Sequence, residues 1–174
     1  GKKLSKFIPF VEEVLGVEFK IKPKVEELDK KHVEKAFVNH DFISELRSRF
    51  NKDRFTEEDN ERLLHSHGQH STDEVYKVLY SKLKKFTDLV FYIESEEEAI
   101  ELIELAKKHD VCLIPYGGGT NVTNALRPPE DEHRMIVTVD TRRLNKIESL
   151  DKENLMVTVQ SGITGKDLEE ALNK

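Results

Sequence analysis

The segment PYGGGTN, residues Pro115–Asn121, directly follows the short apolar run Val111–Ile114. Three consecutive glycines lose much conformational entropy on folding, so they are expected where a backbone turns sharply or approaches another molecule closely. With no Cβ atoms in the way, successive amide N–H groups can converge on one point, and such an arrangement binds anions, phosphates above all. The segment therefore predicts either a tight turn or a phosphate-binding loop at the end of a strand.

The residues after the glycines exclude the two best-known phosphate motifs. A P-loop carries Gly-Lys-Ser/Thr at the start of a helix, whereas Gly119 is followed by Thr120 and Asn121 with no lysine. The dinucleotide fingerprint also places its glycines at the opening of a helix, and the residues from Asn121 to Asn124 do not predict a helix start. If it binds phosphate, the loop is a third kind of cradle.

The sequence before the loop predicts a βαβ unit. The runs Leu89–Ile93 and Val111–Ile114 are short, apolar and β-prone, as expected for strands buried on both faces. Ser95 and Glu98 have the spacing of a capping box that begins a helix between them. The apolar stripe of that helix consists of Ala99, Leu102, Ile103 and Ala106. The crossover between the two strands is expected to be right-handed.

The rest of the chain divides into two regions. Downstream, Met135–Val139 and Leu155–Val159 predict further strands, and Thr164 is placed to cap a last helix. Residues 1 to 86 predict helices joined by loops. One helix is expected from Phe10 to Gly16 and another from His32 to Phe50, with a break near Asn39–Asp41. A third is expected after the capping box of Ser71 and Glu74, with an apolar face of Val75, Leu79, Leu83 and Phe86. We therefore expect an α/β protein with a helical region over residues 1–86 and a second domain over residues 87–174.

Composition narrows the class of protein. The 174 residues carry a net charge of -6, which argues against nucleic acid as the main partner. The single cysteine, Cys112, cannot form an internal disulfide, which favours a reducing compartment, and its apolar strand predicts a core role. No apolar run approaches the length of a membrane span. The pattern Leu168–Lys174 has no helix stop signal, so we expect the chain to be part of a longer protein.

Three segments together resemble the vanillyl-alcohol oxidase type of flavoprotein. Ile114–Val122 is similar to the first FAD-binding loop of that family, and Val139–Ile147 and Gln160–Gly165 are similar to its next two landmarks in the same order. Within it, the alkyldihydroxyacetonephosphate synthase (alkylglycerone-phosphate synthase) family fits best, because Asn39–Phe42 and Arg62–Gly68 resemble its helical N-terminal region. The resemblance implies the first half of a PCMH-type FAD-binding domain after a helical region.

This resemblance also implies a function. The family exchanges the acyl chain of acyl-dihydroxyacetone phosphate for a long-chain fatty alcohol, a step of ether-lipid (plasmalogen) synthesis in peroxisomes, with FAD as cofactor, peripheral membrane contact and a homodimeric assembly. The alternatives are an FAD-dependent oxidase or dehydrogenase of a 2-hydroxy acid or alcohol, and a non-catalytic module of the same fold. The family's catalytic segments have no counterpart here, so we expect the catalytic residues beyond Lys174 and this chain alone to be inactive.

The candidate cofactor-binding residues follow from the matched positions. In the loop they are Pro115, Tyr116, Gly117, Gly118, Gly119, Thr120 and Asn121, and downstream they are Gly162, Thr164 and Gly165. The family loop often has a small or aliphatic residue in place of Tyr116 and serine in place of Asn121. Asp140 and Thr141 end a strand on the way to the cofactor face, where a turn role and a role beside the cofactor are equally open.

Three histidines within six positions raise the question of a metal site. His65, His67 and His70 have no cysteine or acidic residue beside them that completes an obvious ligand set, so we expect no metal. For His67 we favour a hydrogen-bonded structural role over one near the substrate phosphate.

Overall fold

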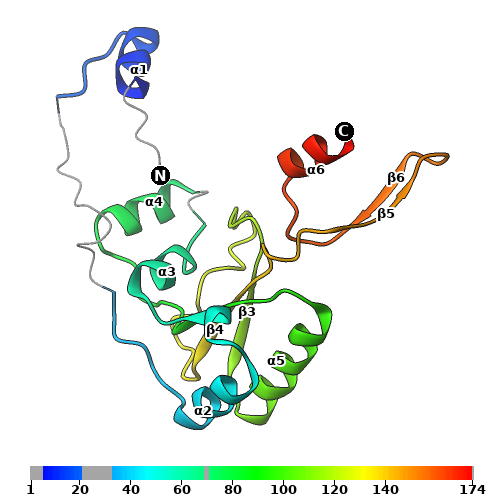
Figure 1. Ribbon diagram of the computed structural model, residues 1–174. Coiled ribbons are helices and arrows are strands. Elements are labelled where there is room, and N and C mark those ends of the chain that lie inside the picture. Colours follow the sequence, from blue (N-terminus) through cyan, green and yellow to red (C-terminus); the bar gives the residue numbers. More distant parts are fainter. Residues whose placement is uncertain (1–5, 21–32, 69–70, 174) are drawn as a thin grey trace.

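The computed structural model describes residues 6–20, 33–68 and 71–173, with most helices in the first half of the chain and most strands in the second (Figure 1). The elements are α1 (Phe7–Leu15), α2 (His40–Arg49), the 3-10 helix η2 (Lys52–Arg54), β1 (Phe55–Thr56), α3 (Asp59–Leu64), α4 (Thr72–Leu79), β2 (Leu89–Tyr92), α5 (Glu96–Lys108), β3 (Cys112–Tyr116), β4 (Ile136–Asp140), β5 (Ile147–Asp151), β6 (Met156–Val159) and α6 (Gly165–Leu172). The expected α/β class is confirmed.

A four-stranded sheet in the order β1-β2-β4-β3 forms the centre of the molecule. β4 pairs in parallel with β2 on one side and β3 on the other, while β1 pairs antiparallel with β2. The register aligns Tyr92, Asp140 and Tyr116, so three strands end at the same edge of the sheet. The glycine run begins at this edge.

Helices α2 and α5 cover one face of the sheet and form the main core with it. Phe42 and Leu46 of α2 and Leu102 of α5 are almost fully buried against Phe91 and Val137 of the strands. Burying apolar surface contributes about 25 cal/mol per Å², so α2 is held mainly by this contact. Because α2 lies in the N-terminal region yet shares this core, the division at residues 86 and 87 stays a sequence prediction.

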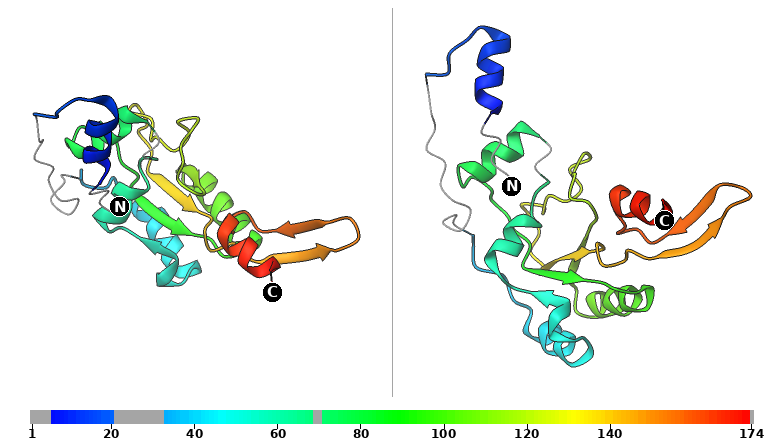
Figure 2. Two further views of the ribbon diagram at one scale, coloured as in Figure 1. Left: turned by 90° about the horizontal axis from the view of Figure 1, so that it is seen from above. Right: turned by 45° about the horizontal axis from the view of Figure 1, so that its top comes forward.

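Three predicted helix caps are confirmed. Ser95, Ser71 and Thr164 each accept a hydrogen bond from an amide in the first turn of α5, α4 and α6. Gly16 ends α1 in the left-handed conformation, with φ of 63°. No side chain of α1 is buried, and the helix lies apart from the sheet (Figures 1 and 2).

Some helix predictions were wrong in extent. Of the segment predicted from His32, the described residues 33–39 are not helical, because α2 begins only after Asn39, whose side chain accepts a hydrogen bond from the Phe42 amide. Helix α4 ends at Leu79, so Leu83 and Phe86 do not continue its face. In α5 the buried stripe includes Leu105, while Ile103 is 52% exposed.

A second, separate sheet follows the first. β5 and β6 form an antiparallel hairpin that projects from the rest of the chain (Figure 2). β6 was predicted. β5 was not, because its sequence IESLD has charged residues at the second and last positions and is therefore not a continuous apolar run. Among the described residues, none of the helices has both the length and the apolar character needed to cross a membrane.

Candidate functional site

The glycine loop leaves the sheet at its carboxyl edge. Tyr116 is the last residue of β3, and the Thr141 amide, just beyond β4, donates to the Tyr116 carbonyl at 2.9 Å. In open sheets with parallel strands, ligands bind outside the carboxyl ends of the strands. The loop therefore stands where this fold type places its ligands.

Backbone donors in this loop are left for another molecule. The amides of residues 117–120 donate no hydrogen bond to any described residue, and Asn121 begins a turn by accepting from the Asn124 amide at 3.1 Å. The loop lines a hollow of about 330 Å³ together with the residues up to Leu126. This is not the bonding of a closed hairpin, and unbonded amides beside a hollow are compatible with the binding of a phosphate.

The three glycines have different reasons to be glycine. A Cβ added at Gly117 or Gly118 would meet no atom within 4 Å, so the chain itself does not require glycine there. At Gly119 the φ of 72° favours glycine, and an added Cβ would lie 2.3 Å from the Tyr116 hydroxyl, so that side chain would have to shift. Open space above two glycines and unbonded amides fit the pyrophosphate of a dinucleotide. FAD is therefore a cofactor that these residues can hold.

Below the loop lies a buried charged network that the sequence did not predict as a unit. His65 Nε2 lies 2.9 Å from Asp140 Oδ2, and both side chains are buried. Arg142 pairs with the same carboxylate, with Nε 2.8 Å from Oδ2. The Tyr116 ring packs on His65, with ring centroids 4.4 Å apart. Asp140 thus fixes His65, which packs on Tyr116 at the start of the loop.

The carboxyl group of Asp140 stays ionised in this network. Burial raises its pKa, but hydrogen bonds from His65 and Arg142 outweigh burial and lower the pKa to about 2. His65 and Asp140 are 75 residues apart in the sequence, so their spacing gives no signal that they are in contact.

Contacts from the helical region reach the loop through Glu74. The Glu74 carboxylate accepts from the Asn121 side-chain amide and, at 3.2 Å, from the Gly68 amide. Asn121 Oδ1 accepts from the Leu126 amide at 2.9 Å. The sequence indicated Glu74 only as part of a capping box, so this role was missed.

His67 is buried beside these contacts, but not in the role expected for it. Within the described part of the chain neither ring nitrogen has a hydrogen-bond partner, so the hydrogen-bonded structural role was wrong. Burial lowers the pKa of His67 and favours the neutral ring. His70 lies outside the described residues.

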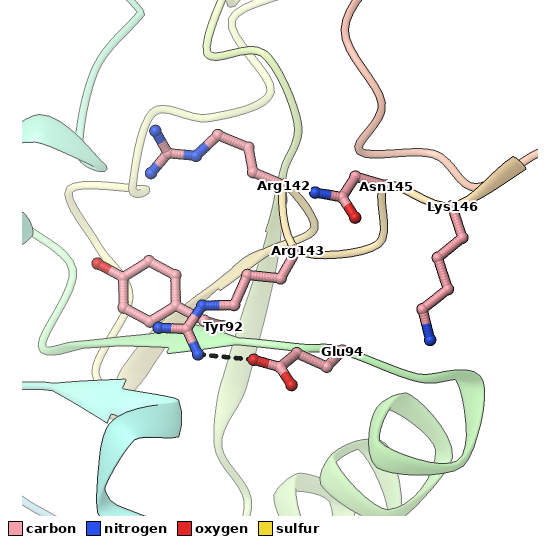
Figure 3. A pocket seen from close by; sticks show the side chains of 6 residues that line it. All are labelled: Tyr92, Glu94, Arg142, Arg143, Asn145 and Lys146. Carbon is pink, nitrogen blue, oxygen red and sulfur yellow. Dashed lines mark hydrogen bonds and ion pairs between the residues drawn. The ribbon is translucent and has the colours of Figure 1, made fainter. Parts of the chain in front are cut away.

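A second hollow adjoins the same edge of the sheet (Figure 3). Its volume is about 520 Å³, and it is lined by Tyr92, Glu94, Arg142, Arg143, Asn145 and Lys146. Arg143 bonds Glu94 at 2.8 Å and lies over the Tyr92 ring, while Arg142 is paired with Asp140. Both guanidinium groups already have carboxylate partners, so they are less available to an anion in this hollow.

The downstream candidates have clear structural tasks. A Cβ at Gly162 would lie 2.0 Å from the Thr141 carbonyl oxygen, so glycine is required by packing against the loop after β4. The Thr164 hydroxyl caps α6 and donates to Asp167 at 2.6 Å, and Gly165 is the first residue of that helix. Gly162 thus lies beside the edge that carries the glycine loop, and direct contact of these three residues with a cofactor stays a prediction. Pro115 and Thr120 are exposed at the same edge.

Known proteins with similar sequences decide the family. A family model described as an FAD binding domain matches residues 87–174. The chain belongs to the FAD-binding domain family. The cofactor predicted from the sequence, FAD, is confirmed at the level of this family.

Members named alkyldihydroxyacetonephosphate synthase match the whole chain. The relative from Caenorhabditis elegans is 36% identical over 174 residues, and that from Trypanosoma brucei brucei is 32% identical over 181 residues. Each match covers 100% of this chain and 29% of the relative. A solved structure of an alkyldihydroxyacetonephosphate synthase matches with a TM-score of 0.86 at 28% identity, covering 97% of this chain and 31% of that one. The resemblance noted in the sequence is confirmed, and the chain spans less than a third of the length of these relatives.

Proposed function

We propose that this chain is the cofactor-cradling part of an FAD-dependent alkyldihydroxyacetonephosphate synthase. The observation that carries the proposal is the glycine loop. Its amides at residues 117–120 make no hydrogen bond to a described residue, and a side chain added at Gly117 or Gly118 would enter open space. The likeness to the synthases extends through residues 1–86, upstream of the FAD-binding domain family match. Likeness over the whole chain favours the synthase over an oxidase or dehydrogenase of a 2-hydroxy acid.

The proposed reaction replaces the acyloxy group of acyl-dihydroxyacetone phosphate by a long-chain alkoxy group. A fatty alcohol enters, the ether-linked alkyl product forms, and the fatty acid leaves. When bound, FAD supplies an electron sink for this chemistry. The described residues hold the cofactor: amides of the glycine loop bind the pyrophosphate, and the network of His65, Asp140 and Tyr116 fixes the base of the loop. The residues that contact the reacting atoms are expected in the part of the synthases that this chain does not cover, so the 174 residues alone are expected to be inactive.

The setting of the enzyme is part of the same proposal. Its substrates are lipids, so the complete protein works at a membrane surface as a peripheral enzyme. A peroxisomal location and a homodimeric assembly accompany this proposal.

A turnover assay on the protein expressed from its complete coding sequence tests the function. Labelled hexadecanol is expected to enter an ether product when acyl-dihydroxyacetone phosphate is supplied, with release of one fatty acid per ether formed. Reduction of a dye by a 2-hydroxy acid without ether product would establish the oxidoreductase instead. A colourless purified protein that releases no flavin on denaturation would leave only a non-catalytic module.

A further inference from the structure

The glycine loop has two ends, and they are fixed by different parts of the chain. Its first end continues β3, and the sheet holds it through the bond between the Thr141 amide and the Tyr116 carbonyl. Its second end, at Asn121, lies beyond the sheet, where β4 offers no ladder partner. Whatever fixes Asn121 therefore sets the curvature of the loop and the direction of its amides.

Asn121 is held by the helical N-terminal region. Its backbone is left-handed, with φ of 53°, a conformation that asparagine tolerates better than most residues. Its side-chain amide donates to the carboxylate of Glu74, in the first turn of α4, and Asn121 is only 6% exposed. The same Glu74 oxygen accepts from the Gly68 amide, and a Cβ at Gly68 would lie 2.1 Å from the Asn121 Cβ. Glu74 thus joins Asn121, 47 residues away, to the segment of Gly68 just before α4.

We propose that Glu74 is a positioning residue for the cofactor, which holds the second end of the glycine loop through Asn121 in the shape that binds FAD. This inference rests on the proposed cofactor-binding role of the loop. In this arrangement the helical region is a working part of the cradle. A preorganised loop loses less conformational freedom on binding, so the tether strengthens FAD binding without touching FAD.

An opposing possibility concerns the role of Asn121 itself. If Asn121 contacted the cofactor directly, a carboxylate at this position would repel the pyrophosphate whatever residue occupied position 74. If its role is to bind Glu74, a carboxylate at 121 fails only because it faces a second carboxylate. The two possibilities therefore differ in whether a change at position 74 can restore binding.

The test is a donor–acceptor exchange in the protein expressed from its complete coding sequence. Asn121→Asp alone places two carboxylates together and is expected to weaken FAD binding at least about tenfold, equal to about 1.4 kcal/mol. The double variant Glu74→Gln with Asn121→Asp reverses the bond, because the new amide at position 74 donates to the new carboxylate at position 121. The new carboxylate at position 121 can still accept from the Leu126 amide, but the Gly68 amide loses its acceptor, because the same Glu74 oxygen binds both Asn121 and Gly68 in the wild type. The double variant is therefore expected to bind FAD at least about threefold more tightly than Asn121→Asp.

Further variants separate the tether from general damage to the fold. Glu74→Ala removes the acceptor and is expected to weaken FAD binding by a similar factor. Asp73→Asn is the matched control, because Asp73 is the exposed neighbour in the same helical turn and its ion pair within the described part of the chain is with Lys77. FAD affinity is therefore expected to stay at the wild-type value. Flavin fluorescence gives the dissociation constant, and melting of the flavin-free protein reports folding.

The outcomes separate the two proposals. If the wild-type protein binds no FAD, the proposed cofactor role fails before Glu74 is tested. If wild type binds FAD but the double variant stays as weak as Asn121→Asp, the positioning role of Glu74 is overturned, as it is if Asn121→Asp binds normally. If Asn121→Asp has a lower melting temperature than the wild type, the proposal requires the double variant to exceed Asn121→Asp in both melting temperature and FAD affinity.

Discussion

At Gly118 the chain leaves room for a side chain that the cofactor would not tolerate. A Cβ there meets no protein atom within 4 Å. Gly118→Val is therefore expected to change the free energy of unfolding of the flavin-free protein by no more than about 0.5 kcal/mol, while FAD retention is lost. Absorbance of the purified protein at the flavin bands and urea unfolding measure the two effects. A fully loaded yellow variant would contradict the assignment of the loop.

Gly119 provides the contrast at the neighbouring position. Its φ of 72° and the Tyr116 hydroxyl leave no place for a methyl group. Gly119→Ala is expected to destabilise the flavin-free protein itself by about 1–3 kcal/mol, because the Tyr116 side chain must move. The urea midpoint measures this loss. Equal stability of the two glycine variants would show that the Tyr116 contact does not restrain the loop.

Asp140 makes stability depend on acid pH with a definite sign. Its pKa in the folded protein is about 2, below the value in an unfolded chain. The unfolded state therefore binds more protons between about pH 4 and pH 2, and stability is lost as the pH falls through this window. At pH 7 the free energy of unfolding of the wild type is expected to exceed that of Asp140→Asn by about 2 kcal/mol or more. This difference is expected to shrink below about pH 4. Urea unfolding across this pH range measures it, and a constant difference would contradict the network.

The elements of the molecule depend on a few polar ends as much as on apolar faces. Asn39 illustrates this, because its oxygen accepts from the Phe42 amide while its nitrogen donates to the His109 carbonyl at 3.0 Å. One side chain thus begins α2 and joins it to the end of α5. This arrangement positions Phe42 and Leu46 in the core.

Asn39→Ala is expected to destabilise the protein by about 1–2 kcal/mol, because α2 loses its cap and its link to α5. The chemical denaturation midpoint measures the change. His40→Ala is the control, since His40 is exposed and its substitution leaves the cap intact. If both variants unfold alike, the cap does not govern the docking of α2.

At this scale the sequence predicted local features well and long-range ones poorly. The caps at Ser71, Ser95 and Thr164 were correct because a cap depends on residues three positions apart. The predicted break near Asn39–Asp41 coincides with the start of α2, but the helix expected before it does not form in residues 33–39, where the Phe37 amide donates to Asp88, just before β2.

The candidate site shows the same division. The glycine loop is a continuous motif, and its position after a strand was predicted. The pairs of His65 with Asp140 and Glu74 with Asn121 join positions 75 and 47 residues apart, and only the folded chain brings them together. Single-sequence patterns carry no information on such pairs.

For the molecule as a whole, the shared core and the Glu74 contact predict that FAD binding also stabilises residues outside the FAD-binding domain. At an FAD concentration about 100 times the dissociation constant, binding is expected to add about 2.7 kcal/mol to stability. Hydrogen exchange is expected to slow in α4 as well as in the loop, because Glu74 connects them. Exchange measured with and without FAD tests this, with the exposed helix α1 as the internal control. Protection confined to residues 87–173 would contradict the coupling.

The strand order β1-β2-β4-β3 has a consequence for how the protein is made. While a ribosome is still synthesising the chain, β2, α5 and β3 emerge first, yet the two strands leave a vacant slot between them that only β4 can fill. Until Asp140 has left the exit tunnel, both inner strand edges are open to pairing with other chains. Nascent chains stalled before Met135 are therefore expected to be held by chaperones, and release is expected only once β4 has inserted.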